Sequence, residues 1–348
     1  MNIEKLNPGA CWTYLLTTDD STCVLIDPVI IHTEEYLKLL SDRKLKLTHV
    51  IDTHTHADHI SAGASLVQAT GCEYIMNEKA PAKCVTSHVK EGDIIEIAGK
   101  QAKVLETPGH TRDSISLLFD DMIFTGDFLF LEDAGAGRDD LPGGDASAHW
   151  ESLRKLDDIS GSVMVYPAHE YRSRVPSDLD NQRAKNPHLR IKEKADFVAY
   201  INDLKLGPAE WMKDVLKANY SCSTDPDAAF IPTDVPACEV KGTMASDIAD
   251  IQVDFIDKYE LVELNSPILL DVREPEELND MLGHLDGIIN IPVGQLSKRL
   301  SEIEEHKDKL IITVCRSGAR AATAAQILSS QGFEKIKVLD GGMIGYRS

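Results

Sequence analysis

The chain has 348 residues, of which 43% are hydrophobic, and its formal net charge is −21 at pH 7. This length and hydrophobic content favour two domains of ordinary size, or one large one, with buried cores, and they exclude disorder over most of the sequence. The acidic balance argues against binding to nucleic acid phosphates or to anionic membrane surfaces.

The N-terminal part predicts alternating strands and helices. Residues 1–8 lack the basic start and the apolar run of a signal peptide, and no later apolar stretch approaches the length of a membrane span. We therefore expect a soluble, cytoplasmic protein. Residues 11–29 predict two strands joined by a polar turn, and a helix over residues 34–43 is expected to lead into a strand at 47–52.

A cluster of three histidines and one aspartate directly follows the strand at 47–52. It contains His54, His56, Asp58 and His59. Imidazole nitrogen and carboxylate oxygen suit zinc, iron or manganese, and a loop at a strand end can aim several short side chains at one point. The cluster predicts a metal site. A solvated polar turn is the alternative, which is disfavoured because further ligands occur later in the chain.

Three later strands each end in a further candidate ligand. His110 follows a strand and a Pro-Gly turn, Asp127 follows a strand and a glycine, and His169 follows a strand and a Pro-Ala pair. Helices alternate with these strands, which is typical of an α/β fold. A lone histidine is usually structural, and we assign that role to the histidines outside this pattern: His32, His49, His88, His149 and His306.

Taken together, these residues resemble the metallo-β-lactamase superfamily over roughly residues 8–240. The resemblance implies an αββα sandwich, in which two sheets pack face to face with helices outside, and we assign residues 1–240 to this domain. It rests on the following residues in the order of the family: His54, His56, Asp58, His59, His110, Asp127 and His169.

Two families within the superfamily share these ligands. Resemblance to glyoxalase II implies a dizinc thioester hydrolase in which Asp127 bridges two metals and His169 binds the second. Resemblance to the persulfide dioxygenases implies one Fe(II) per chain, bound by His54, His110 and Asp127. On that interpretation the neighbouring residues orient ligands or bind substrate without holding a second metal: His56, Asp58, His59 and His169.

The sequence around the ligands favours the dioxygenase. Similarity to that family is found at residues 13–16, 25–29, 53–61 and 166–171. The Gly-x-Gly-Arg-x-Asp loop at 135–140 supports the superfamily but does not distinguish the dioxygenase from glyoxalase II.

Candidate substrate contacts are Arg138 and Tyr171, with a structural salt bridge in the loop as the alternative role of Arg138. At residues 186–188, Asn-Pro-His replaces the Asn-Pro-Arg of many relatives. His188 is a weaker and pH-dependent partner for an anion, so either glutathione persulfide or the persulfide of another small thiol remains open as substrate.

The last hundred residues predict a second α/β domain after a proline-broken stretch at 206–241. Apolar runs at 268–273, 287–292 and 309–314 are typical of parallel strands that are buried on both faces. Cys315 follows the third run and precedes a predicted helix at 321–330. A helix N-terminus, together with Arg316 and Arg320, favours a thiolate, and a buried inert cysteine is the alternative.

These segments resemble a rhodanese domain over roughly residues 246–348. Residues 271–277, 283–292 and 341–343 match its pattern, and the six-residue loop 315–320 fits sulfur rather than phosphate or arsenate chemistry. The resemblance implies a three-layer α/β domain in which Cys315 becomes a persulfide and passes its sulfur to an acceptor, and we expect Arg316 and Arg320 of the same loop to be catalytic with it.

The other cysteines show no comparable context. They are Cys11, Cys23, Cys72, Cys84, Cys222 and Cys238, and their odd total of seven with Cys315 and their wide scatter fit neither a disulfide framework nor a zinc ribbon. We expect most of them to be buried free thiols.

The sequence thus favours a persulfide dioxygenase fused to a rhodanese. Its expected partners are a thiol persulfide, O2, and thiosulfate or sulfite, and we expect a homo-oligomer, a dimer. One rival is a glyoxalase II-like dizinc hydrolase fused to a rhodanese. A second rival is a protein that carries sulfur or senses redox state by using Cys315 stoichiometrically.

Overall fold

The computed structural model describes residues 1–7, 11–18, 21–170, 174–204, 210–229, 231, 254–264, 267–279, 281–316 and 318–347. These residues form two compact units. The first contains the described residues up to Pro226, and the second begins at Asp227. The predicted change of domain between residues 240 and 246 lies outside the described residues.

The first unit contains two six-stranded sheets. One has the order β1-β2-β3-β4-β5-β6, with parallel pairing from β3 to β6, and the other has the order β12-β11-β10-β9-β8-β7, with β10 and β11 parallel. The strands are β1 (Asn2–Lys5), β2 (Tyr14–Thr17), β3 (Thr22–Ile26), β4 (Lys46–Ile51), β5 (Glu73–Asn77), β6 (Ser87–Val89), β7 (Ile94–Ile97), β8 (Lys100–Glu106), β9 (Ile115–Leu118), β10 (Met122–Gly126), β11 (Met164–Pro167) and β12 (Ser177–Asp178).

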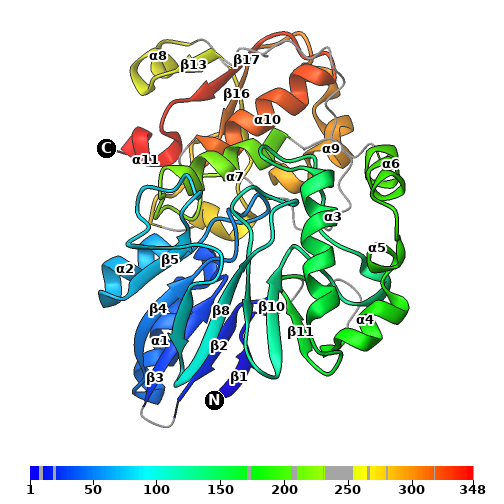
Figure 1. The fold of residues 1–348 in the computed structure, drawn as a ribbon. Helices are drawn as coiled ribbons and strands as arrows, with labels where there is room; N and C mark the ends of the chain where they lie inside the picture. The colour runs from blue at the N-terminus through cyan, green and yellow to red at the C-terminus, as the bar shows by residue number, and fades with distance from the viewer. Residues whose placement is uncertain are drawn as a thin grey trace. The chain divides into compact units, whose positions relative to one another are not determined.

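Helices lie outside these sheets, as Figure 1 shows for α1 and α2 beside β3–β5. The α-helices of this unit are α1 (Thr33–Arg43), α2 (Gly63–Thr70), α3 (Ala146–Lys155), α4 (Leu179–Lys185), α5 (Pro187–Arg190), α6 (Lys194–Leu204) and α7 (Glu210–Tyr220), and its 3-10 helices are η1 (Ile30–His32), η2 (Glu132–Ala134) and η3 (Leu156–Asp158).

The two faces of β2 show how the sheets and helices share the core. Tyr14 and Leu16 join Phe124 of the second sheet in one buried cluster, whereas Leu15 joins Leu40 of α1 and Leu66 of α2 in another. Successive side chains of a strand point to opposite faces, so a run of apolar residues fills both layers. This arrangement confirms the predicted αββα sandwich.

The second unit is built on a five-stranded sheet of order β13-β17-β16-β14-β15, in which every pair is parallel. Its strands are β13 (Asp254–Ile256), β14 (Ile268–Asp271), β15 (Ile289–Asn290), β16 (Ile311–Val314) and β17 (Ile336–Leu339). Its helices are α8 (Lys258–Glu263), η5 (Pro275–Asn279), α9 (Val293–Arg299), η6 (Leu300–Glu302), η7 (Glu304–His306), α10 (Ala319–Ser330) and α11 (Gly342–Arg347).

Both faces of this second sheet are covered by buried apolar side chains. Ile311 of β16 belongs to the cluster that includes Leu328 of α10, whereas its neighbour Ile312 belongs to the cluster that includes Met343 of α11. The parallel sheet with helices on both sides confirms the predicted three-layer domain. Within the described stretches, none of the helices has the length and apolarity needed to cross a membrane.

One disulfide corrects the expectation that these cysteines form no such bonds. Cys84, which lies before β6, is bonded to Cys222 just after α7, with their Cα atoms 5.9 Å apart. Cys23 and Cys72 are buried free thiols, as expected, and Cys315 is also a free and buried thiol. The two bonded residues are 138 positions apart in the sequence, so only the tertiary fold reveals the pair.

Candidate metal centre and candidate sulfur-transfer loop

The loop after β4 is held from two sides. Asp27, at the end of β3, accepts hydrogen bonds from Thr53 N at 2.7 Å and from Thr53 Oγ1 at 2.9 Å. Asn219, at the end of α7, donates to the carbonyl oxygens of His56 at 2.8 Å and His59 at 2.9 Å. Because β3 and β4 are parallel neighbours, their carboxyl ends bring these groups to one edge of the sheet.

The loop brings His54 to His110 and Asp127. Asp127 Oδ2 lies 3.8 Å from His54 Nε2 and 3.7 Å from His110 Nε2, and all three side chains are buried. Two donor atoms that share one metal at bond lengths of about 2.1 Å are at most about 4.2 Å apart. Among the described residues, His54 Nε2 has no hydrogen-bond partner. The donor set and its spacing therefore fit a single ion bound by two imidazoles and one carboxylate.

The other ring nitrogens of these two histidines are held by hydrogen bonds. His110 Nδ1 lies 2.6 Å from the carbonyl oxygen of Arg138, and His54 Nδ1 lies 3.0 Å from Thr53 Oγ1. A carbonyl only accepts, so His110 carries its proton on Nδ1 and turns the lone pair of Nε2 toward Asp127. Burial lowers the pKa of His54 far below its usual range, so this ring is neutral and available to a metal.

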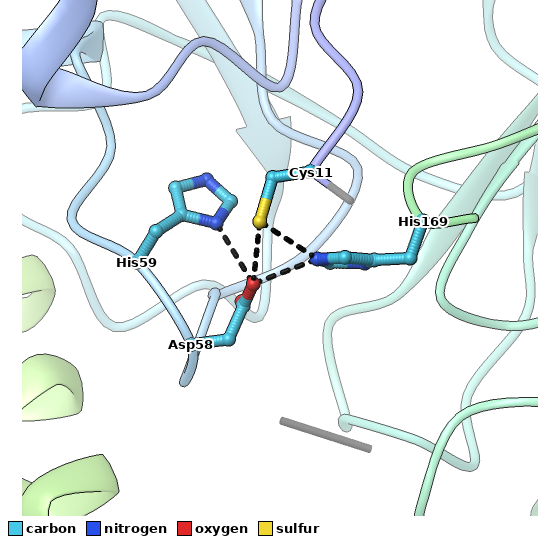
Figure 2. A group of neighbouring side chains, drawn as sticks. All are labelled: Cys11, Asp58, His59 and His169. Atoms are coloured by element: carbon cyan, nitrogen blue, oxygen red, sulfur yellow. Dashed lines mark hydrogen bonds and ion pairs between the residues drawn. The ribbon is translucent and has the colours of Figure 1, made fainter. Parts of the chain in front are cut away.

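A second group lies beside the first and consists of Cys11, Asp58, His59 and His169 (Figure 2). Asp58 Oδ2 is 2.7 Å from His169 Nε2, 3.2 Å from His59 Nδ1 and 3.3 Å from Cys11 Sγ. His169 Nδ1 is 2.6 Å from Asp127 Oδ1, so this ring links the two groups. With a carboxylate on each nitrogen, His169 acts as a double donor that positions Asp127.

The charges around Asp127 set its ionisation. Burial on its own would raise the pKa of this carboxyl, but the positive charge and the hydrogen bond of His169 lower the pKa below its usual range. Asp127 is therefore a carboxylate at neutral pH, as a metal ligand must be.

His56 is not one of the three residues of the first group, although its ring centroid lies 4.2 Å from that of His54. Its Nε2 atom is 3.3 Å from Asp27 Oδ1 and 4.0 Å from Asp52 Oδ1. Burial, with the nearby charge of His59, lowers the pKa of His56 to about 4. His56, Asp27 and Asp52 thus form a further buried group of possible metal ligands.

Cys11 is a residue of the site that the sequence did not reveal. Trp12 N donates to the carbonyl oxygen of Ala168 at 2.7 Å, and a β-bridge pairs Cys11 with His169, which brings Cys11 Sγ to 3.2 Å from His169 Nε2. The contact joins residues 158 positions apart. No local pattern predicts a pairing of this kind.

The two predicted substrate contacts have different outcomes. The guanidinium of Arg138 forms two hydrogen bonds to the carboxylate of Asp140, at 2.6 Å and 2.7 Å. This is the loop salt bridge named as the alternative, and the backbone of Arg138 orients His110. A substrate contact of Arg138 stays a prediction, and Tyr171 lies outside the described residues.

His188 is buried and neutral, which corrects its expected role as a pH-dependent partner for an anion. It is 6% exposed and packs against Phe197 and Gly135, where an added Cβ would be 2.2 Å from its ring. Burial, with a smaller effect of His149, lowers its pKa to about 4. His149 itself is bound to Asp139 at 2.6 Å, in agreement with its structural assignment.

This burial predicts an acid-sensitive contribution to stability. In the folded chain the pKa of His188 is about 4 against an ordinary value of 6.5, so the unfolded chain takes up the proton first as the pH falls. The neutral, buried His188 therefore costs no stability above pH 6.5, and its effect lowers the free energy of unfolding as the pH falls from 6.5 toward 4. We expect His188→Leu to remove up to about 3 kcal/mol of the pH dependence of unfolding between pH 7 and pH 4. Urea unfolding of this variant and of His88→Leu, an exposed control, measures the difference, and equal pH profiles would refute it.

In the second unit, Cys315 lies where β16 ends and α10 begins. Its side chain is 1% exposed, and the backbone N–H of Gly318 donates to Sγ at 3.1 Å. Gly318 has φ 107°, a conformation that glycine adopts readily and that turns the loop into the helix. The predicted sequence of strand, cysteine loop and helix is confirmed.

The two arginines of this loop are each paired with a carboxylate. Arg320 forms a bidentate pair with Glu277 at 2.6 Å and 2.8 Å, and Arg316 Nε is 3.1 Å from Asp227 Oδ2. The roles of Arg316 and Arg320 toward a sulfur substrate stay predictions.

Comparison with known proteins agrees with this geometry. Residues 6–169 match the model of the metallo-beta-lactamase superfamily, and residues 256–348 match that of the rhodanese-like domain. The chain is 30% identical over 233 residues to the human protein "Persulfide dioxygenase ETHE1, mitochondrial", covering 65% of this chain and 90% of that protein.

One solved structure and one hydrolase are also similar. The crystal structure of ETHE1 from Myxococcus xanthus matches with a TM-score of 0.60 and 34% identity, covering 64% of this chain and 99% of that one. Hydroxyacylglutathione hydrolase of Rhodopseudomonas palustris is 41% identical over 150 residues, covering 42% of this chain and 57% of that enzyme. The persulfide dioxygenases are thus matched over nearly their whole length, and the chain belongs to the persulfide dioxygenase family of the metallo-beta-lactamase superfamily, with a rhodanese-like domain at its C-terminal end.

Proposed function

We propose that the first unit oxidises the persulfide of a small thiol with dioxygen, giving sulfite and the free thiol. The reaction balances as RSSH + O2 + H2O → RSH + SO3²⁻ + 2 H⁺. The observation that carries the proposal is the group of His54, His110 and Asp127, whose spacing fits one ion. Two imidazoles and a carboxylate on one ion are typical of ferrous oxygenases.

A ferrous ion bound by these three residues would supply the redox chemistry that the reaction with dioxygen needs. On this proposal the neighbouring residues hold no second metal. His169 is held between Asp58 and Asp127, with a carboxylate on each ring nitrogen, and His56 faces Asp27. A ring that donates both protons has no lone pair for a second metal.

We propose glutathione persulfide as the substrate, with the persulfide of another small thiol as the alternative. The neutral His188 supplies no positive charge for a glutathione carboxylate. Recognition of an acidic thiol would therefore depend on other cationic groups, among which we retain Arg138.

The second unit is proposed to transfer sulfur through Cys315. The thiolate attacks the outer sulfur of thiosulfate and releases sulfite, and a thiol then takes the sulfur as a persulfide, so that S2O3²⁻ + RSH → SO3²⁻ + RSSH. The N–H of Gly318 supports the negative charge on Sγ. Both reactions share sulfite and RSSH, which supports one coupled sulfur pathway.

Metal content tests the proposed site against the dizinc hydrolase. The group of Cys11, Asp58, His59 and His169 is the observation that favours the rival, because it contains donors suited to zinc. We expect the chain to retain one iron after loading with Fe(II) and removal of excess metal. Two tightly bound zinc ions per chain, with hydrolysis of a lactoyl thioester in the absence of oxygen, would establish the rival.

A further inference from the structure

One side chain from the end of α7 holds the loop that carries the proposed metal ligand His54. Asn219 donates from Nδ2 to the carbonyl oxygens of His56 and His59, and its Oδ1 accepts from Ser61 N at 2.9 Å. Asn219 is 9% exposed. All three hydrogen bonds are therefore shielded from water, and they fix the backbone from residue 56 to residue 61.

Asn219 is in turn joined to a disulfide. Cys222 N donates to the carbonyl oxygen of Asn219 at 3.1 Å, and Ser223 N donates to that of Ala218 at 2.9 Å, so a compact turn ends α7. Cys222 is bonded to Cys84, whose backbone N–H donates to Cys222 Sγ at 2.9 Å. The turn that presents Asn219 is thus anchored covalently to the segment before β6.

The backbone at Cys222 gives a second reason why the anchor matters. Its φ is 60°, a left-handed conformation that a residue with a Cβ rarely adopts. Such a conformation persists where surrounding contacts hold it. Of the contacts that hold Cys222, the disulfide is the covalent bond. Opening it is therefore expected to relax the turn and to weaken the hydrogen bonds of Asn219 to the loop.

We propose that Asn219 is a positioning residue for the metal loop and that the Cys84–Cys222 disulfide makes this positioning depend on redox state. The inference rests on the proposed ligand His54, which lies two residues before His56. Opening balances as Cys84–S–S–Cys222 + 2 RSH → Cys84–SH + Cys222–SH + RSSR. The reductant is a small thiol, the same chemical class as the thiol released by the proposed oxidation.

Asn219→Ala tests the positioning role, with Ser221→Ala as the control in the same turn. We expect the metal affinity of Asn219→Ala to fall 10- to 100-fold, the range found when an outer partner of a metal site is removed. Competition with a chelator measures the affinity for Fe(II). Hydrogen exchange of the amides at 56–61 in the metal-free chain should become faster. Asn219→Ser replaces the alanine variant if that variant does not fold.

The redox role is tested on the full chain by opening the disulfide with a phosphine reductant. We expect faster exchange at 56–61 and weaker metal binding in the reduced chain. Cys84→Ser should show both changes without reductant and no further response to it, whereas Cys72→Ala, which removes a thiol from the same core cluster, should behave like the unmodified chain.

Two outcomes would overturn the inference. Unchanged affinity and exchange in Asn219→Ala would remove the positioning role, and unchanged exchange at 56–61 after proven opening of the disulfide would remove the redox role. Neither readout uses turnover. A failure of this inference can therefore be told apart from a failure of the proposed oxidation. If only the proposed oxidation is wrong, the chain binds metal but shows no persulfide-dependent oxygen uptake.

Discussion

Asp127→Asn is expected to reduce persulfide-dependent oxygen uptake by more than about 100-fold. Removing a residue that only hydrogen-bonds to a metal ligand lowers metal affinity or activity by about 10- to 100-fold, and Asp127 is a proposed direct ligand. The carboxylate lies within 3.8 Å of His54 Nε2 and within 3.7 Å of His110 Nε2. An amide has a similar shape but no negative charge, so it would leave two neutral imidazoles to hold the ion.

The same variant should also lose its iron, which a metal assay of the purified protein measures. Asp121→Asn is the matched control, because Asp121 is a surface carboxylate paired with Lys100. Retention of both iron and oxygen uptake in Asp127→Asn would show that the ion is bound elsewhere.

Cys315→Ser is expected to abolish multiple turnovers of sulfur from thiosulfate to a thiol, with a rate loss of at least about 10³-fold. A serine hydroxyl at this position does not form a persulfide. At neutral pH it also stays un-ionised, so it has no negative charge for the N–H of Gly318 to stabilise. Sulfite release under anaerobic conditions measures the reaction.

Oxygen uptake from an added persulfide should be unchanged in Cys315→Ser, because the proposed iron ligands belong to the first unit. Cys72→Ala controls for the loss of a buried thiol. Sulfur transfer that stops after one equivalent in the unmodified chain would favour the stoichiometric carrier over the enzyme.

The sequence predicted best what local pattern determines. The helix predicted over residues 34–43 is α1, which spans Thr33–Arg43. His110 and Asp127 lie close to His54, and their role as metal ligands stays a prediction. Each follows a strand, and strand ends are positions that the order of a sheet brings together.

The sequence failed where a contact joins distant segments. Cys11 reaches the site through a bridge to His169, and Asn219 reaches it from a helix that carries no recognisable motif. The burial of His188 depends on Gly135 and Phe197, which come from other parts of the chain.

Local pattern also overestimated one strand. The apolar run at 287–292 predicted a full strand, but only Ile289–Asn290 pair with β14. Gly287 has φ 75°, outside the strand region, and Pro292 lacks the N–H that a sheet ladder uses. Gly287 and Pro292 therefore limit β15 to two residues.

The central claim is tested most directly by oxygen consumption and sulfite release from the purified chain loaded with Fe(II), after addition of glutathione persulfide. The account predicts oxygen uptake that matches sulfite release one to one. This uptake should disappear in His110→Ala, because the variant lacks the Nε2 atom that faces Asp127. No oxygen uptake with this or any other small persulfide, together with lactoyl-thioester hydrolysis by the zinc-loaded chain, would contradict it.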